Sequence, residues 1–246
     1  MPTYRDEAVV LRTQKLGEAD RIITLLSRRH GKVRAVARGV RRTKSKFGAR
    51  LEPFTHVDLQ LATGRTLDVI TEAVTLHAWS EPLCTDYPRY TVGQVMLETA
   101  DRLVSIEHEP ALPQFQLLTG ALNALVTGTS DGPRPAPLVM DAYLLRAVAT
   151  AGFAPSLDQC ASCGTDGPHD YFSPSAGGVV CRRCRPPGTA LVRPSTLALL
   201  SALISGDWPA TREAHPTDQR QASGLVAAFV GWHLDRGLRT LEHVDR

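Results

Sequence analysis

Four of the five cysteines form two closely spaced pairs, and this spacing is the feature of the chain best suited to chemistry. Cys160 and Cys163 form one C-x2-C pair, and Cys181 and Cys184 form the second after an interval of seventeen residues. Two such pairs, each on a tight turn, can offer four thiolates to one tetrahedral zinc ion. Because four sulfurs leave no open position for water or substrate, the spacing predicts one structural zinc per chain.

Two disulfides or four unrelated thiols are the alternatives to a zinc site. The N-terminal residues include Asp6 and Glu7 where a secretory signal has an apolar core, and no apolar run is as long as a membrane span. We therefore expect a cytoplasmic protein without a membrane partner, a setting that disfavours structural disulfides. His169 could replace a ligand, although four cysteines already complete the set. We expect Cys84 to be a small packed thiol.

Positive charge is concentrated in the first third of the chain. Residues 1–80 contain fifteen Lys and Arg against eight Asp and Glu, a net charge of +7, whereas residues 81–246 carry −4. No acid occurs between Asp20 and Glu52, where eleven cations lie. A run of one sign inside a folded domain costs self-repulsion, so it favours a polyanionic partner over a merely solvated basic face.

The same region alternates apolar and polar residues with the period of a β-sheet. Glycine-containing turns separate the second run from the third and the fourth from the fifth, which predicts two antiparallel hairpins. Five strands in a short domain favour a small Greek-key barrel of the OB-fold type, with an SH3-like barrel as the alternative. The five expected strands cover residues 8–11, 22–26, 33–37, 57–61 and 66–70.

The most basic segment follows the third expected strand and reads RGVRRTKSKFGAR over residues 38–50. Cationic grooves on OB-folds follow nucleic-acid backbones, so we predict that this segment binds nucleic acid. Phe47 has two open roles, which are stacking on a base and anchoring the segment to the barrel. The predicted binding residues are Arg34, Arg38, Arg41, Arg42, Lys44, Lys46, Phe47 and Arg50.

After Trp79 the apolar period changes from two to about 3.6, which predicts amphipathic helices. The cysteine segment is inserted between two of these helices, so zinc would hold the inserted loop in a fixed fold beside the helices. The expected helices cover residues 91–104, 115–126 and 138–152, and two more begin near Pro194 and Thr217.

The predicted fold class is therefore α+β, with a β-barrel domain preceding a helical one. Residues 1–80 are expected to form the five-stranded OB-fold barrel, and residues 81–246 an all-α domain. The four-cysteine zinc module is expected at residues 157–187, inserted in the helical domain.

Catalytic motifs are not evident beside these features. The chain has no GxxxxGK[ST] and no HExxH pattern. Asp68 and Glu72 are the closest acidic set, and no third acid or histidine accompanies them as two-metal nuclease chemistry would need. We expect a protein that is not an enzyme and has no catalytic residues.

Several segments resemble the bacterial recombination mediator family RecO over essentially the whole chain. The match to the zinc module of that family is the sharper one, with GFAPSLDQCASCG at residues 152–164 and YFSPSAGGVVCRRC at residues 171–184. Similarity to its OB domain lies in EAVVLR at residues 7–12, GEADR at 17–21, GKV at 31–33, ARGVRR at 37–42, SKFG at 45–48 and LEPF at 51–54.

The resemblance implies a role in recombinational DNA repair. It implies binding of single- and double-stranded DNA, annealing of complementary strands, and a nucleoid-associated cytoplasmic location. With the partner RecR, such a protein would help RecA to replace single-strand-binding protein on DNA. A zinc-stapled adaptor related to RNA or transcription, without annealing activity, is the alternative, and a nuclease subunit is disfavoured by the missing carboxylates.

Overall fold

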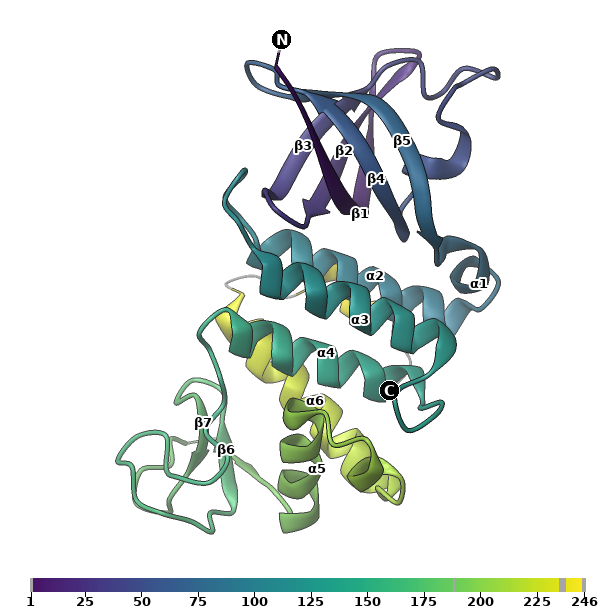
Figure 1. The fold of residues 1–246 in the computed structure, drawn as a ribbon. Coiled ribbons are helices and arrows are strands. Elements are labelled where there is room, and N and C mark those ends of the chain that lie inside the picture. The colour runs from purple at the N-terminus through teal and green to yellow at the C-terminus, as the bar shows by residue number, and fades with distance from the viewer. Residues whose placement is uncertain (1, 188, 235–237, 245–246) are drawn as a thin grey trace. The chain divides into compact units, whose positions relative to one another are not determined.

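The computed structural model describes residues 2–187, 189–234 and 238–244, and its contacts divide the chain into two compact units. The first unit covers residues 1–126 and holds a β-barrel with the helices that follow it; the second covers residues 127–246. Figure 1 shows the strands and helices of both units. Among the described residues, no helix has the length and apolar character needed to cross a membrane.

Five strands close into a barrel in the order β1-β2-β3-β5-β4, which confirms the expected five-stranded barrel. Because β4 returns beside β1 after the β1-β2-β3 meander, the first four strands form a Greek key, as expected of an OB-fold. Both predicted hairpins, β2-β3 and β4-β5, are antiparallel, and a parallel β3-β5 contact closes the barrel. The strands are β1 (Thr3–Leu16), β2 (Asp20–Ser27), β3 (Gly31–Ala37), β4 (Thr55–Ala62) and β5 (Asp68–Ala78).

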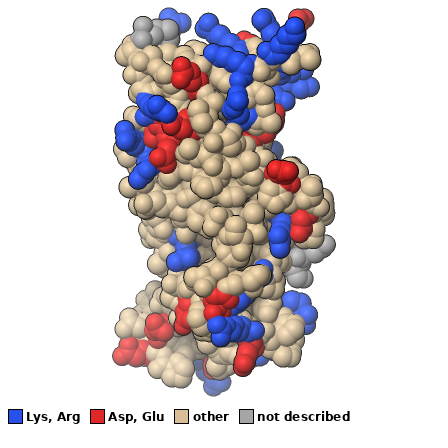
Figure 2. Space-filling model, turned by 45° about the vertical axis from the view of Figure 1, so that its right-hand side comes forward, with Lys and Arg blue, Asp and Glu red and all other residues tan. Residues whose placement is uncertain are grey.

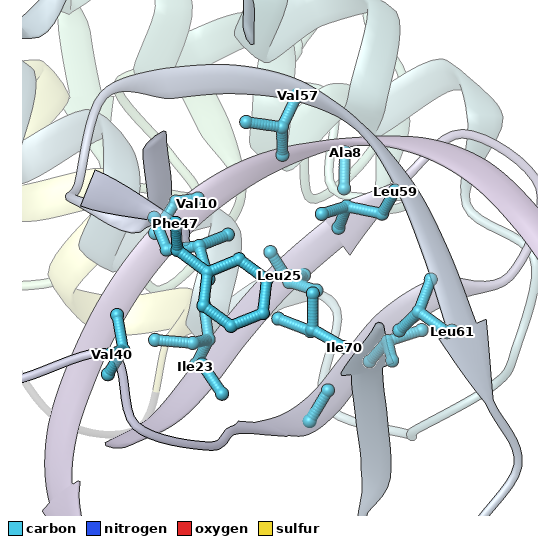
Figure 3. Close-up of a cluster of buried hydrophobic side chains, with 14 residues drawn as sticks. Ala8, Val10, Ile23, Leu25, Val40, Phe47, Val57, Leu59, Leu61 and Ile70 are labelled. Carbon is cyan, nitrogen blue, oxygen red and sulfur yellow. The ribbon is translucent and has the colours of Figure 1, made fainter. Parts of the chain in front are cut away.

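The barrel interior is filled by one apolar cluster contributed by all five strands and by the connection between β3 and β4. Strand β3 shows how the alternating sequence produces this core. Every second residue from Gly31 to Ala37 is buried, while Lys32, Arg34 and Val36 face outward. Figure 3 shows side chains from facing strands meeting in this interior. The loop residues Val40, Phe47 and Leu51 complete the cluster at one end of the barrel.

Three helices follow the barrel in the first unit, namely α1 (Ser80–Cys84), α2 (Tyr87–Leu103) and α3 (Leu112–Thr127). Helix α2 begins where the Asp86 side chain accepts a hydrogen bond from the backbone N–H of Arg89. It packs against β1, and its Asp101 carboxylate pairs with Lys32 of β3 at 2.5 Å. The boundary expected at residue 80 follows the last barrel strand, whereas the contacts group α1–α3 with the barrel. The compact unit that contains the barrel therefore extends to residue 126.

The second unit is helical with a small inserted sheet. Helix α4 leads into the cysteine segment, and α5 and α6 follow it and pack against α4 and each other. The three-stranded sheet, in the order β7-β6-β8, was not expected from the sequence. The helices and strands of the second unit are α4 (Ala136–Thr150), β6 (Tyr171–Ser173), β7 (Gly178–Val180), β8 (Ala190–Leu191), α5 (Pro194–Ser205) and α6 (Pro216–His233). Short 3-10 turns are η1 (Gly48–Leu51), η2 (Pro209–Thr211) and η3 (Arg239–His243).

The barrel is fixed to α2 by a close contact between Phe54 and Gly93. Phe54 is buried with a left-handed φ of 66°, and its backbone N–H donates to the carbonyl of Val10 at 3.2 Å. A Cβ at Gly93 would lie 2.7 Å from Phe54 Cε1, so the ring can reach the helix only because this residue has no side chain.

Gly93→Ala should therefore destabilise the first unit, although alanine is the better helix former. Overpacking costs about 1–3 kcal/mol, against a gain in helix propensity of about 1 kcal/mol. The control is Gly120→Ala in α3, where the added methyl group meets nothing within 4 Å and should stabilise by about 0.5–1 kcal/mol. Urea unfolding of both variants gives the comparison. Equal stabilisation by the two changes would show that the Phe54 ring does not need the space left by the missing side chain of Gly93.

Candidate nucleic-acid interface and metal centre

Most cations of the barrel strands are neutralised in space by acids that lie far away in the sequence. Each guanidinium or ammonium nitrogen lies 2.5 to 3.4 Å from a carboxylate oxygen. Four of the eleven cations in the acid-free run between Asp20 and Glu52 are therefore compensated by acids that lie outside the run. The pairs are Arg5–Asp58, Arg12–Asp101, Arg21–Glu52, Arg28–Glu7, Lys32–Asp101 and Arg34–Glu107.

The basic segment 38–50 is held against the barrel at both of its ends. At its start, the backbone N–H of Gly39 donates to Asp20 Oδ1 at 2.7 Å, and that of Arg41 donates to the Ala19 carbonyl at 2.9 Å. At its end, Lys46 Nζ donates to the Thr71 carbonyl of β5 at 2.7 Å. The segment thus bridges the β1-β2 turn and β5, which gives its cations a fixed position.

The seven cations among the predicted binding residues fall into three groups. Arg38, Arg42 and Lys44 are exposed and make no ion pair or side-chain hydrogen bond within the described part of the chain. Three others are exposed but donate to backbone carbonyls: Arg41 to Gly17 and Glu18, Lys46 to Thr71, and Arg50 to Lys46. Arg34 is half-buried and paired with Glu107. Figure 2 shows Lys and Arg side chains clustered on the barrel.

Exposed cations outside the predicted set include two beside turns of the barrel. Lys15 precedes the β1-β2 turn and Arg65 lies in the β4-β5 turn; both are exposed and, among the residues described, neither forms an ion pair. Connections of this type, between strands one and two and between strands four and five, bind oligonucleotides in OB-folds. A single cation beside a glycine turn was too weak a signal to select either residue.

Phe47 lies in the barrel core, so it is removed from the predicted binding set. Its side chain is 2% exposed and points into the barrel among Val10, Ile23 and Val40 (Figure 3). A base has no access to this ring. Phe47 is buried because the basic segment needs an apolar side chain to hold it against the end of the barrel. Of the two roles that the sequence left open for Phe47, the structure favours that of an anchor.

Phe47→Ala should unfold or severely weaken the barrel without changing how the remaining folded protein responds to salt. Truncation of a fully buried phenylalanine costs about 3–5 kcal/mol. Phe47→Leu keeps most of the buried volume and serves as the control. Thermal unfolding and the salt dependence of oligonucleotide binding, measured on both variants, check this. Weaker binding by a fully stable Phe47→Ala protein would instead support a stacking role.

The four paired cysteines come together in the second unit. Their Sγ atoms all lie within 4.8 Å of one another, with Cys163 and Cys181 at 4.0 Å, and none of the four forms a disulfide. A tetrahedral zinc with Zn–S bonds of about 2.3 Å requires sulfur separations of about 3.8 Å, so the cluster fits the ion closely. The second pair lies on a turn in which the N–H groups of Cys184 and Arg185 both donate to the Cys181 carbonyl at 3.1 Å.

The surroundings of the sulfurs favour a thiolate at Cys160 and oppose one at Cys184. Hydrogen bonding, led by the Cys181 backbone N–H at 3.3 Å, lowers the pKa of the Cys160 thiol to about 6. Hydrogen bonds with Cys181 and then Cys163 raise the pKa of the Cys184 thiol to about 12. Because neighbouring thiolates repel one another, four of them ionise together only around a cation. Zinc would here hold the two turns together and would supply no reaction centre.

The two other residues considered with this cluster have different outcomes. His169 Nε2 lies 2.8 Å from the Thr165 carbonyl, and His169 is not part of the four-residue group. The prediction of a packed Cys84 is wrong, because Cys84 is exposed at the end of α1. The short helix buries the neighbouring Leu83 instead.

Residues 128–132 read GTSDG and so match the G-x-S-x-G pattern of a serine nucleophile, which was overlooked in the sequence. In α/β-hydrolases that serine lies on a sharp turn between a strand and a helix. Here the segment is a tight turn that follows α3 and is closed by Thr129 and Gly132, whose N–H groups donate to each other's carbonyl at 2.9 and 3.0 Å. The element immediately before this turn is α3 and not a strand, so the turn lacks the strand-to-helix geometry of that motif.

Comparison with known proteins covers the whole chain. A family model described as Recombination protein O N terminal matches residues 1–79, and one described as Recombination protein O C terminal matches residues 84–242. Similar proteins named DNA repair protein RecO occur in Cutibacterium acnes, 58% identical, and Thermobifida fusca, 57% identical, over 100% of both chains in each case. A protein of that name from Streptomyces coelicolor is 53% identical over 100% of both chains.

Proposed function

This chain belongs to the RecO family of DNA repair and recombination proteins, and from that premise we propose that it is a non-enzymatic recombination mediator. In this proposal it binds single- and double-stranded DNA through the barrel and anneals complementary strands. With RecR, it helps to load RecA on strands coated by single-strand-binding protein. The names of its relatives give DNA repair as their role. DNA binding, strand annealing and RecA loading are what we propose for this chain.

One observation supports the DNA-binding surface most strongly. Arg38, Arg42 and Lys44 remain without acidic partners in the described structure, although nearby strand cations are paired. An unpaired cation on a fixed segment can neutralise a phosphate without first breaking an internal ion pair. Arg41, Lys46 and Arg50 add positive charge beside these three while their hydrogen bonds keep the segment in place.

Charge neutralisation also provides a mechanism for annealing. Two complementary strands repel each other through their phosphates, and cations bound between them reduce that repulsion. With Phe47 buried, the basic segment has no aromatic side chain to hold unpaired bases. Bases of a strand bound in this way stay free to pair.

The cysteine cluster has a separate, structural role in this proposal. Cys160, Cys163, Cys181 and Cys184 would hold one zinc ion and so fix the inserted module between α4 and α5. Because these residues belong to a different compact unit from the basic segment, the ion is proposed to support folding and not DNA contact.

Annealing of complementary oligonucleotides tests the function directly. The protein should accelerate annealing of fluorescently labelled strands at low salt, and it should lose this effect as salt is raised. A variant with Arg38, Arg42 and Lys44 all replaced by glutamine should anneal slowly while it remains folded. Binding of RNA and DNA without any acceleration of annealing would instead favour a nucleic-acid-associated adaptor.

A further inference from the structure

The connection between α2 and α3 lies along the barrel and forms one isolated β-bridge with β3. Residues 105–111, here called the acidic strap, read SIEHEPA, and Figure 1 shows the α2-α3 connection rising beside β3. Glu107 forms a parallel bridge with Lys32, and the backbone N–H of His108 donates to the Lys32 carbonyl at 2.9 Å. The parallel pairing of β5 with β3 covers Ala35 and Val36, so the strap uses the neighbouring part of the same edge.

The close approach of the strap is built into the sequence of the barrel. Gly31, at the start of β3, has a φ of +59°, and a Cβ there would overlap the carbonyl oxygen of Glu109. On its other side, His108 Nε2 lies 3.8 Å from the buried carboxylate of Asp68. The strap therefore contacts both β3 and β5 and has a fixed place on the barrel.

The strap brings a carboxylate to a cation that would otherwise face solvent. Arg34 points outward from β3, and its guanidinium lies 3.4 Å from Glu107 Oε1. Both side chains are 35% exposed, so the ion pair is accessible and weak enough for a competing anion to replace the carboxylate. Lys32, the next outward cation, is less exposed, at 12%, and is held by Asp101 of α2.

We propose that the acidic strap is an internal competitor of DNA, in which the Glu107 carboxylate occupies Arg34 in place of a backbone phosphate. The inference rests on the DNA-binding function proposed above and concerns the extent of that site. With the strap in place, phosphates are confined to the basic segment 38–50 and the adjacent turns. Release of Glu107 extends the site along the outer face of β3, which is where OB-folds bind oligonucleotides.

Removing one charge from the strap tests this proposal. Glu107→Gln should free Arg34 for one more phosphate, which makes the slope of log K against log salt steeper by about 0.7 for a single strand. At 0.1 M salt this corresponds to binding that is about fivefold tighter. The matched control is Glu109→Gln, which removes the same charge two residues away. Glu109 is exposed and has no side-chain partner in the described structure, so its salt slope should stay at the wild-type value.

Arg34→Gln separates competition from a general charge effect. In the wild-type chain this change should leave the slope almost unchanged, because Arg34 is already occupied. In the Glu107→Gln chain it should remove the additional 0.7 of slope, about one phosphate's share. Melting temperatures of all four variants confirm that each comparison is made on folded protein.

Three results would overturn the proposal. Equal salt slopes for Glu107→Gln and Glu109→Gln would show that the change in DNA binding comes from the loss of one negative charge and not from the release of Arg34. A large loss of slope from Arg34→Gln in the wild-type chain would show that Arg34 already binds phosphate. Both outcomes leave DNA binding by the basic segment intact, whereas a wild-type protein that binds no DNA at all would refute the proposed function and the strap together.

Discussion

Replacing Cys181 with serine should remove the bound metal and lower the melting temperature of the second unit by about 10 °C or more. A structural zinc contributes on the order of 10 kcal/mol in small zinc-binding peptides, and loss of even a third of this amount gives a shift of that size. Cys160→Ser should act in the same way, since its sulfur belongs to the same cluster. Metal content by mass spectrometry and thermal unfolding provide the two measurements.

The chain offers a matched control for this prediction in Cys84→Ser. Cys84 is exposed and lies outside the four-cysteine group, so the same chemical change there should alter neither metal content nor stability. The salt dependence of DNA binding per folded molecule should be the same for all three variants, because the basic segment belongs to the other unit. Freshly purified protein with no bound metal, or with disulfides among these cysteines, would contradict the zinc assignment.

The sequence predicted the barrel and the main helices because their patterns are local. Strand β3 has strict alternation, and α2, α3 and α4 carry apolar stripes at helical spacing. Strand lengths were underestimated where a strand continues past the core, because residues 12–16 of β1 and 71–78 of β5 are mostly exposed. In β1, Val9 and Leu11 are buried as well as the core residues Ala8 and Val10, so the alternating pattern disappears. Strands of two or three residues, as in the sheet of the cysteine module, are too short to show any period.

The two candidate sites differ in how much the sequence could predict, because their contacts differ in range. The cysteine pairs are separated by two residues each, and their spacing alone identified the cluster that the structure brings together. The ion pairs of the barrel join residues 21 to 89 positions apart, as in Arg28–Glu7 and Arg12–Asp101. Composition therefore showed an unbroken basic run, whereas the folded chain leaves a smaller set of unpaired cations.

The unpaired cations of the basic segment should account for a large part of the salt dependence of DNA binding. Replacing Arg38, Arg42 and Lys44 together with glutamine should flatten the single-strand salt slope by about 2, at about 0.7 for each phosphate that is no longer neutralised. Affinity at 0.1 M salt should fall about a hundredfold. Titrations of a labelled oligonucleotide at several salt concentrations measure both quantities, and unfolding curves should remain close to wild type because the three side chains are exposed.

The control for the triple variant removes three cations that the structure shows as paired. Arg5, Arg21 and Arg28 each lie within 3.2 Å of a carboxylate, so a phosphate can reach them only by displacing Asp58, Glu52 or Glu7. Changing these three to glutamine alters the net charge by the same amount, yet should flatten the slope much less. If both triple variants lose the same slope, binding depends on total charge and the basic segment is not a defined site. If the control loses more, the phosphates lie along the paired strands, and the internal carboxylates yield to DNA throughout the barrel.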